Sequence, residues 1–296
     1  MSANNFLLIK VDVDTLQGYL QGVPRMLEVL ARRDVKASFY FSFGPDNSGK
    51  AIFRIFRKGF LTKMLRTKAP ATYGLKTMMY GTLLPAPMIV AANPQIVADT
   101  AAAGHECGLH AWDHVKWQDK LSKLSQAEIA GDLKKAADLF TQITGAQPKS
   151  FAAPGWQLTS NALAALDSFN FDYVSNTRGH APCYPVFDGQ KFKTLEIPST
   201  LPTMDEIFGA GGINDGNVAD YYISLLKPGF NVHTVHAEME GGSKIKQFED
   251  FLTRAQDKGY KIIPLKEIAQ AYKSSGESVI KLGYLPGRAG TVAVQD

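Results

Sequence analysis

The sequence predicts an α/β fold, an irregular (β/α) barrel of about seven strands. Short apolar segments that read as strands alternate with amphipathic segments that read as helices, and this alternation predicts a parallel sheet. Polar residues with catalytic potential recur where strands end, which favours a barrel over an open, doubly wound sheet. The 296 residues, 45% hydrophobic and 20% charged, are enough for one large core. We therefore expect a single barrel domain over residues 1–275.

The expected elements follow from hydrophobic periodicity and from residues that start or stop helices. Strands are expected at 6–11, 37–41, 106–109, 150–152, 173–175, 195–197, 231–236 and 261–263. Helices are expected at 23–33, 94–103, 125–143, 159–169, 218–226, 243–258 and 265–273. Ser125 and Glu128 form a capping-box pattern, and Gly145 and Gly259 mark helix ends. The Gly- and Ser-rich stretch 276–296 is expected to be a loose tail.

Two aspartates, Asp12 and Asp14, follow the apolar run of the first strand. Alternate residues of a strand share a face, so both carboxylates can point into one pocket. Two carboxylates on one face repel each other unless a cation or a proton lies between them, which indicates a metal site or an acid/base site. The alternative is an exposed turn with both acids solvated.

Three of the six histidines fall within eleven residues, at 105, 110 and 114. The spacing of His110 and His114 suits one side of a helical turn with room for an ion between the imidazoles. Two imidazoles and one carboxylate form a three-ligand set for zinc, manganese or cobalt that leaves positions open for water and substrate. The alternative is a loop with a purely structural role.

The segment 48–92 is an insertion with a basic, amphipathic pattern. No Asp or Glu occurs between Asp46 and Asp99, whereas basic residues alternate with apolar and aromatic ones; the bases that we single out are Arg54, Arg57, Lys58, Lys63 and Arg66. This pattern is typical of a segment that lies on an anionic membrane surface or faces a phosphorylated lipid. The alternative is a core helix with a solvated basic face. Nucleic acid is not expected as a partner, because the rest of the chain has no basic stripe or nucleic-acid motif.

Two later segments supply further candidate residues. The Pro-Gly turn before Trp156 follows a strand, where the backbone N–H groups of Gly155 and Trp156 can reach an oxyanion. His236 ends an apolar strand and is suited to protonate a leaving amine, although a buried structural histidine would show the same pattern. No run of eighteen apolar residues is present, and residues 1–5 lack the features of a secretion signal, so a cytoplasmic protein is expected.

Taken in order, these motifs resemble those of the polysaccharide deacetylase family, metal-dependent N-deacylases of carbohydrates built on an irregular (β/α) barrel. The resemblance implies that Asp12 is the general base and His236 the general acid. It also implies that Asp14, His110 and His114 bind one divalent metal ion. Together the motifs cover about residues 6–265.

The chain departs from the family pattern at two motifs. The third motif normally carries an Arg where Ala152 stands, and that Arg orients the base. The fourth normally has an Asp followed by a Trp, whereas Asn176 and Arg178 occur here. Both are candidates for substrate contact, and Arg178 for a lipid phosphate.

Several phrases are similar to family members that remove a formyl group from a sugar carried on a polyprenyl phosphate. They are Asp12-Val13-Asp14-Thr15, Gly44-Pro45-Asp46-Asn47, Gly108 to His114, Leu201-Pro202-Thr203 and His236-Ala237-Glu238. The resemblance implies a lipid-linked substrate and a location on the inner face of the cytoplasmic membrane. Two alternatives remain open: a deacetylase of a soluble amino sugar or a cyclic amide hydrolase, and a non-catalytic glycolipid-binding protein. The sequence leaves the oligomeric state open.

Overall fold

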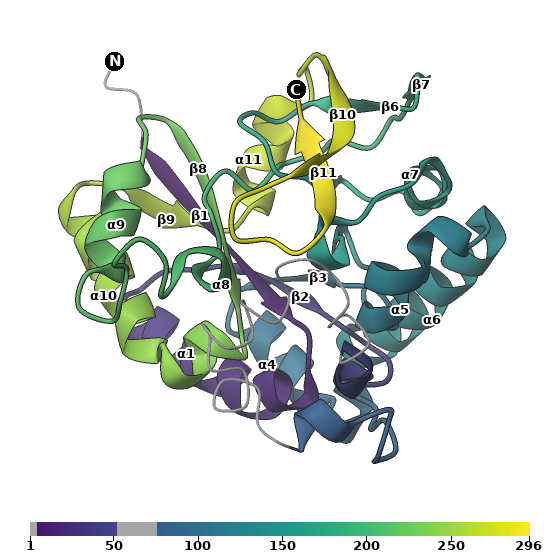
Figure 1. Ribbon diagram of the computed structural model, residues 1–296, viewed down its shortest axis with the longest axis horizontal. Coiled ribbons are helices and arrows are strands. Elements are labelled where there is room, and N and C mark those ends of the chain that lie inside the picture. The colour runs from purple at the N-terminus through teal and green to yellow at the C-terminus, as the bar shows by residue number, and fades with distance from the viewer. Residues whose placement is uncertain (1–4, 52–75) are drawn as a thin grey trace.

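A curved, all-parallel sheet forms the centre of the computed structural model, which describes residues 5–51 and 76–296 (Figure 1). The strand order is β5-β4-β3-β2-β1-β8, and β9 also pairs with β1. The strands are β1 (Phe6–Val13), β2 (Ser38–Phe41), β3 (Glu106–Leu109), β4 (Ser150–Ala152), β5 (Tyr173–Ser175), β8 (Phe230–His236) and β9 (Lys261–Ile263). The predicted parallel sheet and its seven strands are confirmed.

β1 pairs with three other strands, and its two faces differ in character. One edge pairs with β8 from Phe6 to Asp12, and the other pairs first with β9 and then with β2. Leu7, Ile9 and Val11 belong to the main apolar core. The intervening residues Lys10 and Asp12 lie on the opposite face, as strand alternation requires, and both are buried.

An extended segment joins the two ends of the sheet, although it is too irregular to form a full strand. Near its start, the Ile197 N–H donates to the Val174 carbonyl of β5. Near its end, the Thr200 N–H donates to the Val232 carbonyl of β8. The strand expected at 195–197 is thus present as an isolated bridge to β5, and hydrogen bonds from the following residues to β8 give the sheet its barrel-like form.

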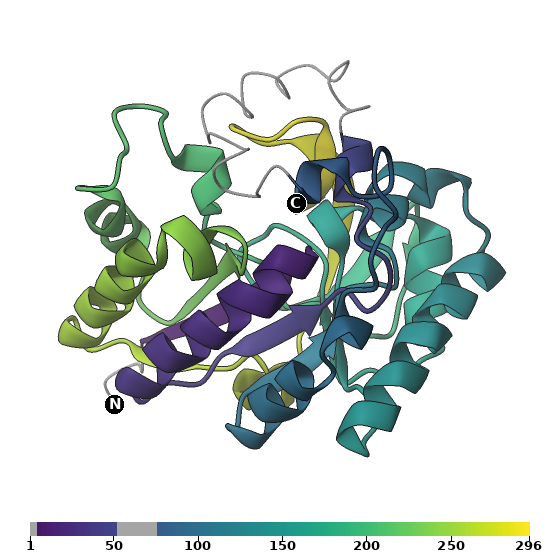
Figure 2. The same cartoon turned by 90° about the horizontal axis from the view of Figure 1, so that it is seen from below.

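Helices cover the outside of the sheet in an arc that Figure 2 shows from below. They are α1 (Val23–Arg32), α4 (Gln95–Ala102), α5 (His114–Lys120), α6 (Gln126–Thr144), α7 (Ser160–Asp167), α8 (Met204–Ile207), α9 (Val218–Leu225), α10 (Ile245–Asp257) and α11 (Lys266–Ala269). The predicted capping box is present at the start of α6, where the side chains of Ser125 and Glu128 bond to each other's backbone N–H. Gly145 ends α6 with a φ of 72°. Within the described residues no helix is long and apolar enough to cross a membrane.

The C-terminal residues are ordered, so the expectation of a loose tail over 276–296 was wrong. β10 (Glu277–Tyr284) and β11 (Thr291–Gln295) form an antiparallel hairpin, and β10 joins β6 (Tyr184–Phe187), which pairs with β7 (Gln190–Lys191). The hairpin is bonded to the barrel through Arg178, whose N–H donates to Ala293 and whose carbonyl accepts from the Gln295 N–H. Glycines that we read as signs of disorder serve as turns, since Gly287 and Gly290 both have positive φ.

The insertion is described only in part. Its described residues include two short helical turns, Thr77–Met79 and Val90–Ala92. The bases at 54, 57, 58, 63 and 66 lie outside the described residues, so the expected membrane-facing helix stays a prediction.

Candidate active site

Asp14, His110 and His114 meet at the carboxyl ends of β1 and β3. The Asp14 Oδ1 lies 3.2 Å from His110 Nε2, and Oδ2 lies 3.2 Å from His114 Nε2. Each of the three residues places one ligand atom close to those of the other two, so together they could hold a metal ion. Although burial raises the pKa of Asp14, the neighbouring His114 and His110 imidazoles hold it well below its usual value.

The two histidines do not share a helical turn, so the expected geometry was wrong while the expected convergence is present. His110 lies in the loop after β3, and His114 is the first residue of α5. Ala111, with a φ of 70°, reverses the chain between them. A loop with one left-handed residue therefore joins the two histidines, and sequence periodicity does not reveal such a loop.

Hydrogen bonds fix the orientation of the His110 imidazole and the backbone position of His114. His110 Nδ1 lies 2.8 Å from the Ala152 carbonyl, which can only accept, so this nitrogen carries the proton and Nε2 offers its lone pair. Asp113 caps α5 by accepting from the Lys116 N–H at 2.9 Å, and its other oxygen accepts from Asn47 at 2.7 Å. These contacts hold His114 at the helix start.

The donor set fits a divalent metal ion. Two imidazoles present Nε2 to one carboxylate, and the buried Oδ1 of Asp14 has no hydrogen-bond partner. Imidazole and carboxylate ligands suit zinc, manganese or cobalt.

Asp12 occupies a different environment two residues earlier in β1. It is 3% exposed, its Oδ2 lies 3.5 Å from Lys10 Nζ and 3.9 Å from His110 Nε2, and its Oδ1 has no hydrogen-bond partner. Asp12 thus lies at the edge of the candidate metal site with one oxygen free to accept a proton.

Glu238 holds the backbone between the aspartates and the first helix. Its Oε1 accepts from the N–H groups of Asp14 (2.8 Å) and Thr15 (2.7 Å), and from the Thr15 hydroxyl (2.9 Å). Gly18 lies so close that a Cβ there would be 2.3 Å from this carboxylate oxygen. The chain segment that presents Asp14 is therefore tightly constrained.

His236 ends β8 and is paired with Asp12 in the β1–β8 register. Its Nδ1 lies 4.0 Å from Asp205 Oδ1, and its backbone N–H donates to Glu240 at 2.8 Å. Burial alone would lower the pKa of His236, but the negative charges of Asp205, Asp14, Glu240 and Asp12 raise it to about 8. At neutral pH the imidazole therefore carries a proton that it can donate.

The remaining candidates are located near this site but are largely engaged by the protein itself. The Trp156 N–H donates to the Ala153 carbonyl, so it is not free for an oxyanion, whereas Gly155 adopts a φ of 58° in the same turn. The Arg178 guanidinium donates twice to Glu206 and once to the Leu201 carbonyl. Arg178 is thus engaged by internal partners, and its expected contact with a lipid phosphate remains a prediction.

Asn176 differs from these residues, because both atoms of its buried side-chain amide lack a partner. Its backbone N–H donates to Glu196 at 2.7 Å. Its expected contact with substrate remains a prediction.

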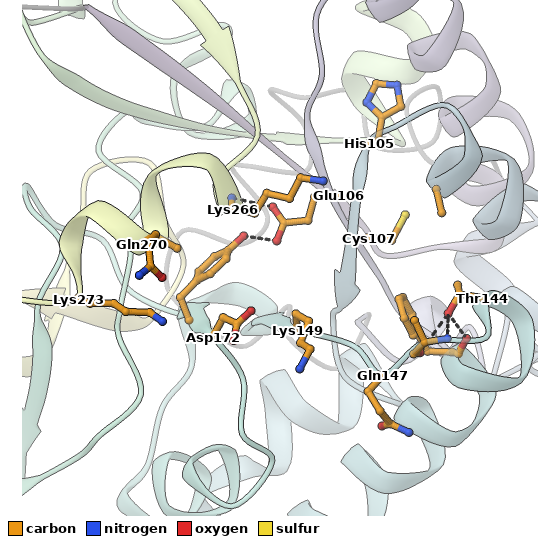
Figure 3. Close-up of a pocket in the computed structure, with 15 residues that line it drawn as sticks. His105, Glu106, Cys107, Thr144, Gln147, Lys149, Asp172, Lys266, Gln270 and Lys273 are labelled. Atoms are coloured by element: carbon orange, nitrogen blue, oxygen red, sulfur yellow. Dashed lines mark hydrogen bonds between the residues drawn. The ribbon is translucent and has the colours of Figure 1, made fainter.

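A cavity of about 430 Å³ lies at the other end of β3, away from these residues (Figure 3). It is lined by His105, Glu106, Lys149 and Lys266, among others. Glu106 accepts from the hydroxyls of Ser38, Ser150 and Tyr173 and from the Lys266 N–H, which closes the barrel beneath the candidate site.

Sequence reasoning missed Lys10, Asp205, Glu238 and Arg288. A lysine between apolar residues in a buried strand was a usable signal, because lysine is seldom fully buried without a partner. Glu238 lies two residues after His236, so it could have been considered as part of the same motif. Asp205 and Arg288 gave no local signal, since tertiary structure alone brings their side chains within 3.9 Å of each other.

Comparisons with known proteins agree with this geometry. Residues 14–174 match the family model described as polysaccharide deacetylase. A protein from Shewanella sediminis, named a probable 4-deoxy-4-formamido-L-arabinose-phosphoundecaprenol deformylase ArnD, is 40% identical over 88% of this chain and 84% of its own. A protein of the same name from Wigglesworthia glossinidia brevipalpis is 34% identical over 93% of this chain and 96% of its own.

The fold also matches a crystal structure from Mycobacterium smegmatis that is provisionally described as a polysaccharide deacetylase. The TM-score is 0.62 at 14% sequence identity, over 93% of this chain and 92% of the other. This likeness confirms the deacetylase type of (β/α) barrel.

Proposed function

The chain belongs to the polysaccharide deacetylase family and is an amide hydrolase, and from this premise we propose that it removes the formyl group from 4-deoxy-4-formamido-L-arabinose carried on undecaprenyl phosphate. The names of two relatives, at 40% and 34% identity over most of the chain, support this substrate. The product would be the free 4-amino sugar on the same lipid, together with formate.

The observation that carries the proposal is the separation of acid and base on two adjacent strands. Asp12 on β1 and His236 on β8 are register neighbours, and the trio of Asp14, His110 and His114 lies beside them. A carboxylate and a protonated imidazole on either side of one reacting carbon suit amide hydrolysis, which needs one group to take a proton and another to give one.

In the proposed reaction, Asp12 accepts a proton as a water oxygen forms a bond to the formyl carbon. His236 then donates its proton to the sugar nitrogen while the C–N bond breaks, because an unprotonated amide nitrogen is a poor leaving group. Asp205 keeps His236 charged through its negative field.

Asp14, His110 and His114 would hold one divalent ion. When bound, such an ion supplies Lewis acidity and lowers the pKa of a bound water from 15.7 toward about 7. The identity of the ion as zinc, manganese or cobalt is open in this proposal.

We propose further that the protein works as a peripheral protein at the inner face of the cytoplasmic membrane, where a polyprenyl phosphate presents its head group. The basic residues Arg54, Arg57, Lys58, Lys63 and Arg66 would contact anionic lipid there. The amino sugar would serve lipid A modification, and hence resistance to cationic antimicrobial peptides such as polymyxin.

The experiment is mass spectrometry of the lipid-linked formamido sugar after incubation with the purified protein and a divalent metal. We expect the loss of one formyl group and the release of formate. An unchanged formamido lipid alongside turnover of an acetylated analogue would refute the deformylase and leave a deacetylase. No turnover of either, with retained binding of the glycolipid, would favour a non-catalytic binding protein.

A further inference from the structure

Lys10, in β1, is a fully buried lysine with an exposed fraction of 0%. Removing an ammonium group from water costs several kcal/mol unless nearby groups compensate for the loss. The proposed reaction gives this residue no role, so its surroundings call for an explanation.

The ammonium of Lys10 points along the inner face of β1 toward the catalytic end. It donates to the Ser175 carbonyl at 3.0 Å and lies 3.5 Å from Asp12 Oδ2. The rings of Trp156 and Tyr40 flank it, with centroids 5.4 and 5.8 Å from Nζ. These contacts enclose the cation, so it cannot reach a substrate phosphate or act as a nucleophile.

Two carboxylates offset part of the cost of burying Lys10. Burial lowers its pKa, and the negative charges of Asp12 and Glu196 oppose this effect only in part. Asp12, in turn, is nearly buried and has no hydrogen-bond donor on Oδ1. The two residues therefore compensate for each other's burial.

Lys10 is linked to β4 and β5 through the Ser175 carbonyl. Ala152, at the end of β4, carries only a methyl group. Ala152 pairs with Ser175 across β4 and β5, and Ser175 is the residue whose carbonyl holds the Lys10 ammonium. The cation thus reaches the end of these strands from β1 instead of from β4.

We propose that Lys10 is the positioning residue for Asp12: it fixes the carboxylate as the general base and supplies, from β1, a cation that Ala152 on β4 does not offer. This inference rests on the proposed function for its effect on kcat alone. The contact between Lys10 and Asp12 can be tested without turnover.

The kinetic test compares Lys10→Met, Lys10→Arg and the exposed control Lys193→Met, each saturated with Zn²⁺ and assayed on the lipid-linked formamido sugar. We expect Lys10→Met to lower kcat about 10- to 100-fold, with KM and metal content within about twofold of the parent, because only the proton transfer is impaired. Lys10→Arg should recover at least part of kcat. A kcat for Lys10→Met within twofold of the parent, or a change confined to KM, would overturn the proposal.

A double-mutant cycle provides the measurement that needs no activity. Thermal unfolding is recorded for the Zn²⁺-saturated parent, Lys10→Met, Asp12→Asn and the double variant. We expect each single change to lower Tm and the double change to lower it by clearly less than the sum, since each single change strands one buried charge. Additive shifts would refute the pairing. If the parent fails to hydrolyse the lipid substrate, the proposed function fails while this cycle still decides the role of Lys10.

Discussion

Two aspartates that are equivalent in the sequence pattern have distinct surroundings in the structure. Asp14 faces two imidazole nitrogens at 3.2 Å, whereas Asp12 faces Lys10 and lies 3.9 Å from His110. The difference arises because the strand ends between them: Asp12 is the last β1 residue paired with β8, and Asp14 begins the turn that Glu238 holds. Asp14 is therefore placed to bind metal and Asp12 to accept a proton.

Substituting each aspartate by asparagine should separate these roles. Asp14→Asn should lose bound metal, because a neutral amide is a much weaker ligand for a divalent ion. Asp12→Asn should retain metal and lose about 10²- to 10⁴-fold in kcat, the usual contribution of a general base. Metal content by mass spectrometry and turnover of the formamido lipid measure both effects. Equal loss of metal in both variants would contradict the division.

The protonation state of His236 should set the alkaline limit of activity. Because its pKa is raised to about 8, the imidazolium is present at neutral pH and is lost above that value, so kcat/KM should fall as the pH rises past about 8. Asp205→Asn removes a charge that raises this pKa, and should move the alkaline limb to lower pH by about one unit. Asp257→Asn, at an exposed position on α10, is the control and should leave the profile in place. A limb that does not move in Asp205→Asn would contradict the assigned role of Asp205.

Local motifs predicted the residues that lie close together in sequence, and missed those that only the fold brings near. His110 and His114 are joined by a short loop, so their spacing was informative even though the expected helix was wrong. Asp205 reaches His236 from α8, and Arg288 reaches Asp205 from the β10–β11 turn. No periodicity encodes such long-range approaches, so these residues could not be predicted.

At the scale of elements, strands and helices with a clear period were predicted, and those without one were not. β1 and α6 carry long apolar patterns and were expected nearly at their observed bounds. β10 has an irregular burial pattern in which only Ile280 is buried, and it pairs with β6 over residues 277–279 and with β11 over residues 280–284. Its composition therefore suggested a tail.

The C-terminal hairpin should contribute measurably to stability if it is docked as the structure shows. Gln295 Oε1 accepts from the N–H groups of His180 (2.8 Å) and Ala181 (3.1 Å), and its amide donates to the Ala181 carbonyl (2.9 Å). Gln295→Ala should lower the free energy of unfolding by about 1–2 kcal/mol, because it leaves these groups unpaired. Gln190→Ala, at an exposed position of β7, should change it by less than about 0.5 kcal/mol. Denaturant unfolding of both variants tests this, and equal values would favour a loose tail.

At the scale of the whole molecule, the two faces of the sheet differ, because the outer face packs on the main apolar core and the inner face carries buried polar side chains beside a smaller apolar cluster. Helices cover the outer face of β1, while the inner face carries Lys10 and Asp12 toward the site. Glu106 closes one end with a set of hydroxyl donors, and Glu196 lies near the other, accepting from Asn176 and Thr177. The fold brings donors from other strands to these carboxylates, since Glu106 on β3 accepts from hydroxyls on β2, β4 and β5, and such partners offset the cost of burial.

The protonation of Glu196 should link this interior to global stability. Burial raises the pKa of Glu196 to about 7, above the value of 4.5 for a free side chain. The folded state therefore binds the proton more tightly than the unfolded state, and the stability that this provides is present below about pH 4.5 and is lost as the pH rises to about 7. Glu196→Gln keeps an acceptor for the Asn176 and Thr177 N–H groups but carries no titrating proton. Relative to the parent it should gain about 2 kcal/mol in free energy of unfolding between pH 5 and pH 8. Glu28→Gln, at an exposed position of α1, is the control and should show a nearly constant difference. Chemical denaturation at several pH values measures both, and a Glu196→Gln difference that stays flat or falls with pH would show that the interior does not hold this carboxyl protonated.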